Sequence, residues 1–532
     1  MSRFGRYCLL GVVWLAAVCR LPGLFANTFH ADEALFAFWA RLIAVWRDPL
    51  LLAQAVDKPP LLFYGQALFY PLLGPVEWAA RMPNLIASLL LVPLVALLAW
   101  RIYRNEWVAL IAGLIVALSP LGIQFSATAF TDPLLTALLM ASLVVASSKL
   151  QFTGAPIIHS IEYSQTRRLA GSQTRRLADS PTYSGLLFGL AVATKHQAWL
   201  FLPLLSGVAL LSGWRRRQWR RWLAGLAPVL LLLLLWEVVR TGGPALWPMQ
   251  LANFGGIRPI WSWELQPRLL AWLAQWQYVA APPLLIAGIA AAAGLLLRAW
   301  RGANRAAAFD LLFVLYLAAY ALMHWLLAVP VWDRYLLPAV PMAALILSRS
   351  FWQMVRNVQK LIREKTCANS YNSSLLPLKR INSYRCASLS LGIYTTLLIL
   401  LLALQLPGAW QARSGHFPIG GRPAADSGAA AVAQALAGLP YGTVLYDHWY
   451  SWQWRYHLFD GRVYVGWFPH LSALAEDLAA FGRDGNPRYL ALPDDSVALP
   501  VRRAVTRSGF ELQPVPIETP TEIELYQIMP VP

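Results

Sequence analysis

The chain has 532 residues, of which 58% are hydrophobic and 13% charged, and it contains 25 tryptophans. This composition excludes an ordinary soluble protein of the same length and indicates a polytopic membrane protein. The net charge of +18 does not indicate a nucleic-acid partner, because Lys and Arg cluster in short connections between apolar runs. The four cysteines lie in the first apolar run and in one basic loop, so we expect neither a structural disulfide nor a cysteine metal site.

The amino-terminal apolar run is predicted to be a retained membrane helix and not a secretory signal. It follows Arg3 and Arg6, and no small-x-small cleavage site precedes Arg20. A spanning helix needs about 20 apolar residues. Breaks at charges, Pro and Gly divide the chain into eleven candidate spans. They lie near residues 7–26, 81–100, 107–122, 132–148, 183–194, 197–213, 222–240, 271–297, 309–328, 335–349 and 388–407.

If the amino terminus is cytoplasmic, the predicted spans place the Lys and Arg residues in agreement with the positive-inside rule. The cytoplasmic side then receives 25 Lys and Arg residues, against ten in the opposite loops and nine in the carboxy-terminal region. Within the span at 271–297, Pro282-Pro283 predicts a kink or a division. In the basic loop at 150–182, a heptad beginning at Ser164 is repeated from Ser172, which is typical of an insertion in a tolerant loop.

The composition changes from about Trp410 onward, where the long apolar runs stop. Short β-like runs occur at 443–446, 463–465 and 489–492, beside a helix-like stretch at 472–481. We therefore predict a transmembrane domain over residues 1–407 and a small extracytoplasmic α/β domain over residues 408–532. The aromatic run from His448 to Trp454 is open to two interpretations, a surface that stacks on sugars or binds protein, or packing inside this domain.

Outside its arginine clusters, the chain gathers its ionisable residues on one side of the predicted membrane. After the first span come Asp32 and Glu33, and a short loop later Asp57 and Lys58 stand before two prolines. Three more ionisable residues lie at the ends of later spans: Asp132, Lys195 and Arg334. Even on the lenient insertion scale a charge at the bilayer centre costs about 2.5–3.5 kcal/mol, so charges gathered at one face indicate a binding site.

These residues also have purely structural interpretations. Asp32 could cap the amphipathic stretch at 34–46, and Asp132, which precedes a proline, has the pattern of a helix N-cap. Lys195 and Arg334 lie at helix ends, where snorkelling anchors are common. Both interpretations stay open for each residue at the level of the sequence.

Carboxylates beside fixed cations at a membrane face suit a substrate with a phosphate head on a lipid tail. The cations pair with the phosphate, and the carboxylates hold a metal ion or accept a hydroxyl proton. A phosphate leaving group needs neutralisation more than protonation, so Lys, Arg or a metal ion would supply the main catalytic effect. Tyr335 and most of the tryptophans are attributed to an interfacial belt or to packing.

Five short motifs resemble a known family in their order and in their side of the membrane. They are Asp32-Glu33, Lys58-Pro59-Pro60, Thr131-Asp132, Thr194-Lys195 and the run from Trp332 to Pro338. They resemble the bacterial members of glycosyltransferase family 39, the superfamily of protein O-mannosyltransferases and of the transferase that adds aminoarabinose to lipid A. The resemblance covers residues 1–407. It implies a GT-C fold and the inverting transfer of a hexosyl or pentosyl group from a polyprenyl-phosphate donor to an extracytoplasmic glycolipid, protein or glycan.

The resemblance also implies roles for individual residues. The catalytic carboxylates would be Asp32 and Glu33. Asp132 would reach the sugar, and Asp57 would bind a divalent metal cation. Three cations would bind the donor phosphate: Lys58, Lys195 and Arg334. The expected location is the inner cell membrane, with the lipid-linked sugar, its acceptor and membrane lipids as partners and no nucleic acid.

Two departures limit what the resemblance transfers. Leu35 stands where the aminoarabinose transferases carry Arg, and no predicted loop is long enough for the lumenal β-trefoil of the protein mannosyltransferases. One alternative function is a transporter or flippase for an anionic lipid-linked substrate, although such proteins usually show related halves and polar groups near the midplane. A non-catalytic scaffold with a partner-binding tail is the other alternative.

Overall fold

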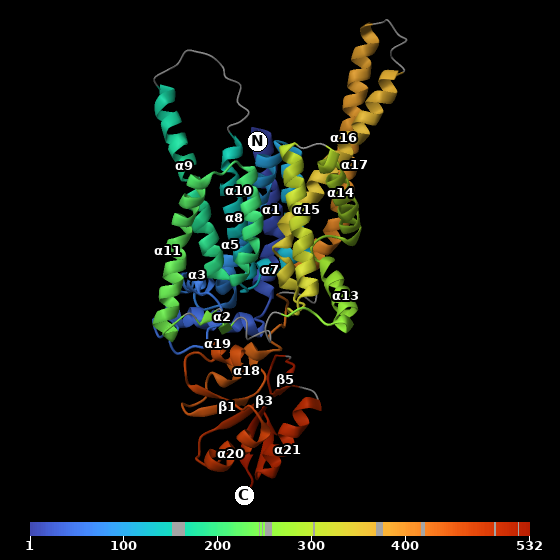
Figure 1. The fold of residues 1–532 in the computed structure, drawn as a ribbon. Coiled ribbons are helices and arrows are strands. Elements are labelled where there is room, and N and C mark those ends of the chain that lie inside the picture. The colour runs from blue at the N-terminus through green and yellow to red at the C-terminus, as the bar shows by residue number, and fades with distance from the viewer. Residues whose placement is uncertain are drawn as a thin grey trace.

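The computed structural model describes residues 1–151, 165–243, 245–246, 248–249, 258–301, 304–368, 376–416, 421–493, 496–519 and 521–532. Long helices form a bundle, and a smaller region that contains a β-sheet lies beyond one end of it (Figure 1). The amino terminus lies at the opposite end of the bundle (Figure 1). The sheet region and the amino terminus are therefore separated by the length of the helices.

Twelve helices in the described part of the chain form the bundle and the helical extensions that project from it. They are α1 (Arg3–Ala26), α5 (Glu77–Tyr103), α6 (Glu106–Ala117), α7 (Pro120–Ser126), α8 (Asp132–Ala146), α9 (Gln165–Thr194), α10 (Leu202–Leu211), α11 (Arg216–Thr241), α14 (Pro282–Arg301), α15 (Arg305–Leu326), α16 (Ala339–Ala368) and α17 (Leu376–Arg413). Among the described residues, four of them are each long and apolar enough to cross a membrane, and the bent pair α6–α7 makes a fifth. The chain is a multi-pass membrane protein, and the count of eleven spans stays a prediction.

Two of the predicted spans are broken, and each break has a local cause. The predicted span at 107–122 bends by 56° between α6 and α7, where Ser119 caps α7 and a proline occupies its first position. The predicted span at 271–297 is divided between α13 (Leu265–Trp276) and α14, which begins at Pro282. Proline suits the first position of a helix, where its missing N–H would have no partner, so α14 begins at Pro282. The predicted division at Pro282-Pro283 is confirmed.

The predicted basic loops are partly helical, so those loop predictions were wrong. Helix α9 begins at Gln165 and includes the second copy of the repeated heptad, whereas the first copy begins outside the described residues. Helix α16 continues to Ala368 and α17 begins at Leu376. Arg, Lys, Gln and Ala are good helix formers, so these polar stretches prolong the apolar helices. In Figure 1, α9, α16 and α17 project beyond the bundle.

The connection between α1 and α5 folds into short helices at the end of the bundle that faces the sheet (Figure 1). These are α2 (Ala31–Ala44), α3 (Leu61–Ala67) and α4 (Tyr70–Leu73). The N-cap of α2 is His30, whose Nδ1 accepts a hydrogen bond of 3.2 Å from the backbone N–H of Asp32. Glu33 completes the capping box by accepting from the backbone N–H of His30 at 3.1 Å. The N-cap interpretation of Asp32 was therefore wrong, and its carboxylate is available for other contacts.

The carboxy-terminal region contains a five-stranded sheet in the order β2-β1-β3-β5-β4. Its strands are β1 (Thr443–Asp447), β2 (Val463–Trp467), β3 (Arg488–Pro493), β4 (Phe510–Pro514) and β5 (Ile523–Pro530). Its helices are α18 (Ala429–Leu436), α19 (Ser451–His457), α20 (Leu471–Phe481) and α21 (Leu499–Arg507). The first three strands are parallel, and β5 runs antiparallel to β3 and β4. The sequence predicted β1, β2, β3 and α20 correctly and missed β4 and β5.

Helix α19 packs against α2 and so connects the carboxy-terminal region to the short helices at the end of the bundle. Arg41 of α2 donates a hydrogen bond of 2.9 Å from a guanidinium nitrogen to the backbone carbonyl of Tyr456. Its guanidinium also lies 4.3 Å from the centroid of the Phe459 ring. The Tyr456 ring packs edge-on against Phe29 at 4.9 Å between centroids. Within the predicted aromatic run, Trp454 is fully buried in the core of this region, which agrees with the packing interpretation for that residue.

Candidate functional site

A pocket of about 240 Å³ lies where several connections between helices meet. Its walls come from α2, the turn before α3, the start of α8, the turn between α9 and η2 (His196–Phe201), and η4 (Asp333–Leu336). Six of the seven predicted site residues line it: Asp32, Asp57, Lys58, Asp132, Lys195 and Arg334. The fold thus brings together charges that are as much as 302 positions apart in the sequence.

Each of the three carboxylates in the pocket is paired with one of the three cations. Arg334 donates to an Asp32 oxygen at 2.9 Å, and Lys195 donates to an Asp132 oxygen at 2.6 Å. Lys58 pairs with its neighbour Asp57. The Asp32 side chain is 41% exposed, whereas that of Asp132 is 1% exposed. Asp32 is therefore the carboxylate that an incoming molecule can reach most readily.

Aromatic rings hold two of the cations in place. The Arg334 guanidinium lies 4.3 Å from the centroid of Trp332 and 4.8 Å from that of Phe130. The Lys195 ammonium lies 4.8 Å from the centroid of Tyr335. A cation–π contact fixes the position of a cation without neutralising it, so the cation still attracts anions. Lys195 and Arg334 point into the pocket, so the snorkelling interpretation was wrong, and Tyr335 is part of the pocket wall and not of an interfacial belt.

Burial lowers the pKa of Lys195 to about 8, although the nearby carboxylate of Asp132 acts in the opposite direction. Asp132 is the first residue of α8, and Thr131 before it occupies the N-cap position. The N-cap interpretation of Asp132 was therefore wrong by one residue. Its direct contact with Lys195 favours a role in keeping that ammonium charged and in place.

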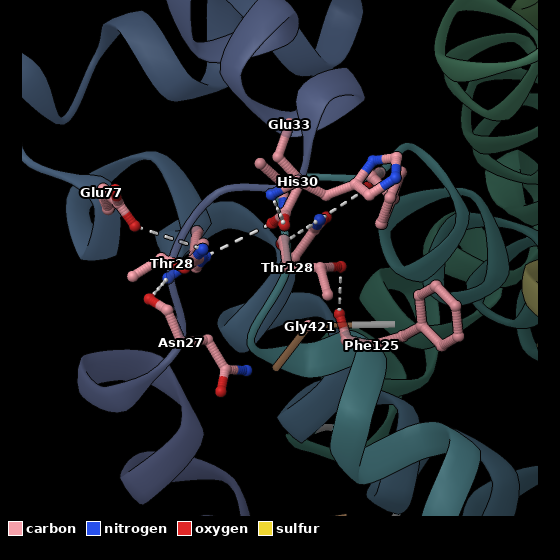
Figure 2. Close-up of polar contacts among 12 residues, drawn as sticks. Asn27, Thr28, His30, Glu33, Glu77, Phe125, Thr128 and Gly421 are labelled. Carbon is pink, nitrogen blue, oxygen red and sulfur yellow. Dashed lines mark hydrogen bonds and ion pairs between the residues drawn. The ribbon is translucent and has the colours of Figure 1, made fainter. Parts of the chain in front are cut away.

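Glu33 does not line the pocket, unlike its neighbour Asp32. It is fully buried, and its Oε1 accepts a hydrogen bond of 2.6 Å from the backbone N–H of Ala129. The same oxygen lies 3.3 Å from the Nε of Arg81, which is also fully buried. Figure 2 shows Glu33 beside His30, with Thr128 nearby. These contacts indicate a structural role and give no support to the predicted catalytic role.

Arg81 of α5 connects α2 to the segment that follows α1. Besides Glu33 of α2, it contacts the backbone carbonyl of Asn27 at 2.6 Å and the carboxylate of Glu77 at 3.5 Å. The next polar residue of α5, Asn84, donates to the backbone carbonyls of Thr128 and Phe130 at 2.7 and 2.6 Å. The network holds the start of α2 against the segment that precedes Asp132. Sequence reasoning missed Arg81, although Glu77 and Arg81 have the i, i+4 spacing of a helical ion pair.

The pocket does not fit a preformed metal centre. Within the described ranges, no three His, Cys, Asp or Glu side chains gather closely enough to hold a metal ion. Asp57 is paired with Lys58, and that positive charge opposes a second cation at the same carboxylate. These contacts give no support to the predicted metal site at Asp57.

Comparison with known proteins assigns the fold. A family model described as dolichyl-phosphate-mannose-protein mannosyltransferase matches residues 57–154. ArnT from Cupriavidus metallidurans in the apo state matches with a TM-score of 0.60 at 18% sequence identity, over 99% of this chain and 98% of ArnT. The chain has the GT-C glycosyltransferase fold. The fold that the sequence motifs implied is confirmed.

Two further structures support the same fold. ArnT bound to undecaprenyl phosphate matches with a TM-score of 0.57 at 15% identity, over 98% of this chain and 97% of that one. The Archaeoglobus fulgidus oligosaccharyltransferase tethered with an acceptor peptide gives a TM-score of 0.56 at 12% identity, over 96% of this chain and 73% of that one. No curated protein matches the sequence.

Proposed function

We propose that this GT-C protein is an inverting glycosyltransferase. It transfers a hexosyl or pentosyl group from a polyprenyl-phosphate-linked donor to an extracytoplasmic glycolipid, protein or cell-surface glycan. The observation that carries the proposal is the pocket in which Lys58, Lys195 and Arg334 converge beside three carboxylates. The structures of ArnT with undecaprenyl phosphate and of the archaeal oligosaccharyltransferase with dolichol-phosphate support a lipid-linked phosphate as the donor.

In this proposal the three cations bind the donor phosphate. Each cation is already paired with one carboxylate. An entering phosphate therefore competes with these carboxylates for the cations. Hydrogen bonds between ionised partners are about twice as strong as those between neutral groups. As the bond to the sugar breaks, charge grows on the phosphate oxygen, and fixed cations stabilise that charge without rearrangement.

Asp32 is proposed to activate the acceptor. The acceptor oxygen or nitrogen attacks the anomeric carbon, the bond between that carbon and the phosphate oxygen breaks, and the electron pair leaves with the phosphate. The acceptor proton passes to the Asp32 carboxylate, which is the most exposed acid of the three ion pairs. Asp132 keeps Lys195 in place and remains within the pocket as a candidate sugar contact. No step of this transfer passes through a metal ion.

The proposed location is the inner membrane, with a cytoplasmic amino terminus and an extracytoplasmic carboxy-terminal region. The positive-inside distribution of Lys and Arg supports this orientation. Reporter fusions placed after Asp32 and after Lys195 are expected to report the same, extracytoplasmic compartment. Opposite compartments for the two fusions would overturn the proposed site.

Proteoliposomes that contain the purified protein test the proposed function directly. A polyprenyl-phosphate donor with a labelled sugar is expected to yield a labelled acceptor and free polyprenyl phosphate. Mass spectrometry of glycolipids and surface glycans from a deletion strain supplies the acceptor. Movement of the intact donor across the bilayer with no new glycosidic bond would instead establish a flippase.

Binding of the donor phosphate is expected to weaken as the pH rises through about 8, the pKa of Lys195. A lysine is charged below its pKa and neutral above it, so each pH unit above this value lowers the affinity by up to about tenfold. Binding of undecaprenyl phosphate, measured by titration at several pH values, checks this. Lys195→Arg stays charged throughout and is expected to remove the dependence. A flat wild-type profile would show that Lys195 does not contribute its charge.

Chelation with EDTA is expected to leave transfer activity unchanged, because the pairing of Asp57 with Lys58 disfavours a bound cation. Activity after EDTA treatment and after readdition of Mg²⁺ or Mn²⁺ is the measurement. Loss on chelation, recovery with the metal, and an Asp57→Asn variant that no longer responds would together establish the metal site.

A further inference from the structure

A second pocket, of about 180 Å³, lies where two interruptions of the membrane helices meet α17. Its walls come from the α6–α7 bend at Pro120, the α13–α14 junction at 277–282 and the part of α17 from Leu404 to Gln411. It shares no lining residue with the pocket that holds Asp32. Its described lining includes three glutamines and no Asp, Glu, Lys, Arg or His. An ion therefore finds no countercharge there.

Gln405 is a buried polar residue in the lining of this pocket. The residue is 1% exposed, and its Oε1 accepts a hydrogen bond of 2.8 Å from the backbone N–H of Ala281. This bond fixes the orientation of the amide, because only the oxygen can accept it. Within the described chain, Nε2 has no hydrogen-bond partner. A buried donor that lacks a partner is unfavourable, so the pocket selects an occupant that offers a hydrogen-bond acceptor.

The helices around Gln405 present apolar side chains to their surroundings. Ile286 and Ile289 of α14 are exposed, and so are Leu406 and Trp410 of α17. On a membrane helix such side chains face lipid tails, and a tryptophan is typical of the level of the headgroups. A molecule that fits this pocket therefore carries an uncharged hydrogen-bond acceptor next to an apolar chain.

We propose that this pocket binds the ester group of a membrane glycerolipid. The ester carbonyl accepts a hydrogen bond from Nε2 of Gln405, and the acyl chain lies along α14 and α17. The ester is the uncharged acceptor that stands at the junction of tail and headgroup, so it matches both the neutral lining and the apolar flanks. Along the chain, α7 starts at Pro120 in this pocket and leads to the segment before Asp132 in the other pocket. The proposal does not depend on the sugar-transfer reaction.

Photo-crosslinking of the purified full-length protein tests the site. The probe is a diacylglycerol with a diazirine on one acyl chain, close to the ester. Labelled peptides are expected from residues 282–289 and 404–411. Unlabelled dioleoylglycerol and phosphatidylglycerol, which both carry esters, should compete equally. A dialkyl ether analogue and farnesol, which lack the carbonyl, should compete about three- to tenfold more weakly, as expected for one neutral hydrogen bond.

Three variants make the test specific. Gln405→Leu removes the donor and is expected to lower labelling about three- to tenfold. Leu404→Trp fills the pocket without removing the hydrogen bond between Gln405 and Ala281, so it should abolish labelling even where Gln405→Leu fails to fold. Gln434→Leu makes the same change at an exposed position of α18 in the carboxy-terminal region and should have no effect. Labelling elsewhere, or equal competition by the ether analogue, would overturn the proposal.

Discussion

Replacement of Asp32 by Asn is expected to lower kcat by about 10²–10⁴-fold, the usual contribution of a general base. The substitution keeps the shape of the side chain but removes its ability to take the acceptor proton. It also releases Arg334, which pairs with this carboxylate at 2.9 Å, so donor binding should persist or strengthen. Single-turnover transfer of a labelled sugar and titration with undecaprenyl phosphate measure the two effects separately.

Asp460→Asn is the matched control for this experiment. Asp460 is 90% exposed and forms a longer ion pair, of 3.5 Å, with Arg41, and exposed pairs of this kind contribute about 0–1 kcal/mol. Its transfer rate should equal that of the wild type. A correctly inserted Asp32→Asn protein with full activity would remove Asp32 from the mechanism.

Replacement of Arg81 by Met is expected to destabilise the protein by about 3–5 kcal/mol, the usual cost of leaving a buried charge without its partner. The carboxylates of Glu33 and Glu77 lie 3.3 and 3.5 Å from Arg81 and would lose their shared cation. Unfolding in mixed detergent micelles gives the free energy. Adding Glu33→Gln to Arg81→Met should recover part of the loss, because it removes the uncompensated charge.

Arg258→Met provides the surface comparison for Arg81. Arg258 pairs with Glu264 at 2.8 Å but is 41% exposed, so its loss should cost less than about 1 kcal/mol. Similar costs for the two substitutions would contradict the structural role of Arg81. A folded Glu33→Gln protein whose kcat falls as far as that of Asp32→Asn would instead restore Glu33 as a catalytic residue.

The gathering of the site residues could be predicted because membrane topology constrains them. Apolar runs determine where the chain crosses the membrane. Each crossing places the next polar segment on the opposite side of the membrane. Asp32, Lys195 and Arg334 therefore had to lie at one face, although they are far apart in the sequence. Their pairing could not be predicted in this way, because it depends on how the short helices at that face pack.

The different roles of Asp32 and Glu33 also lay beyond the sequence pattern. Successive residues of a helix point in directions about 100° apart, so only one of the two can face the pocket. The choice depends on the cap at His30 and on Arg81, which lies 48 positions after Glu33. Strands β4 and β5 were missed for a related reason, since their pattern reflects neighbours that are distant in the chain.

Helix α2 serves two parts of the molecule at once. Its first turn carries Asp32, and further along the same helix Arg41 holds the backbone of Tyr456. A rigid rod of 14 residues transmits a tilt at one end to the other. A shift of the sheet region relative to α2 is therefore expected to move Asp32, the proposed proton acceptor, relative to the sugar.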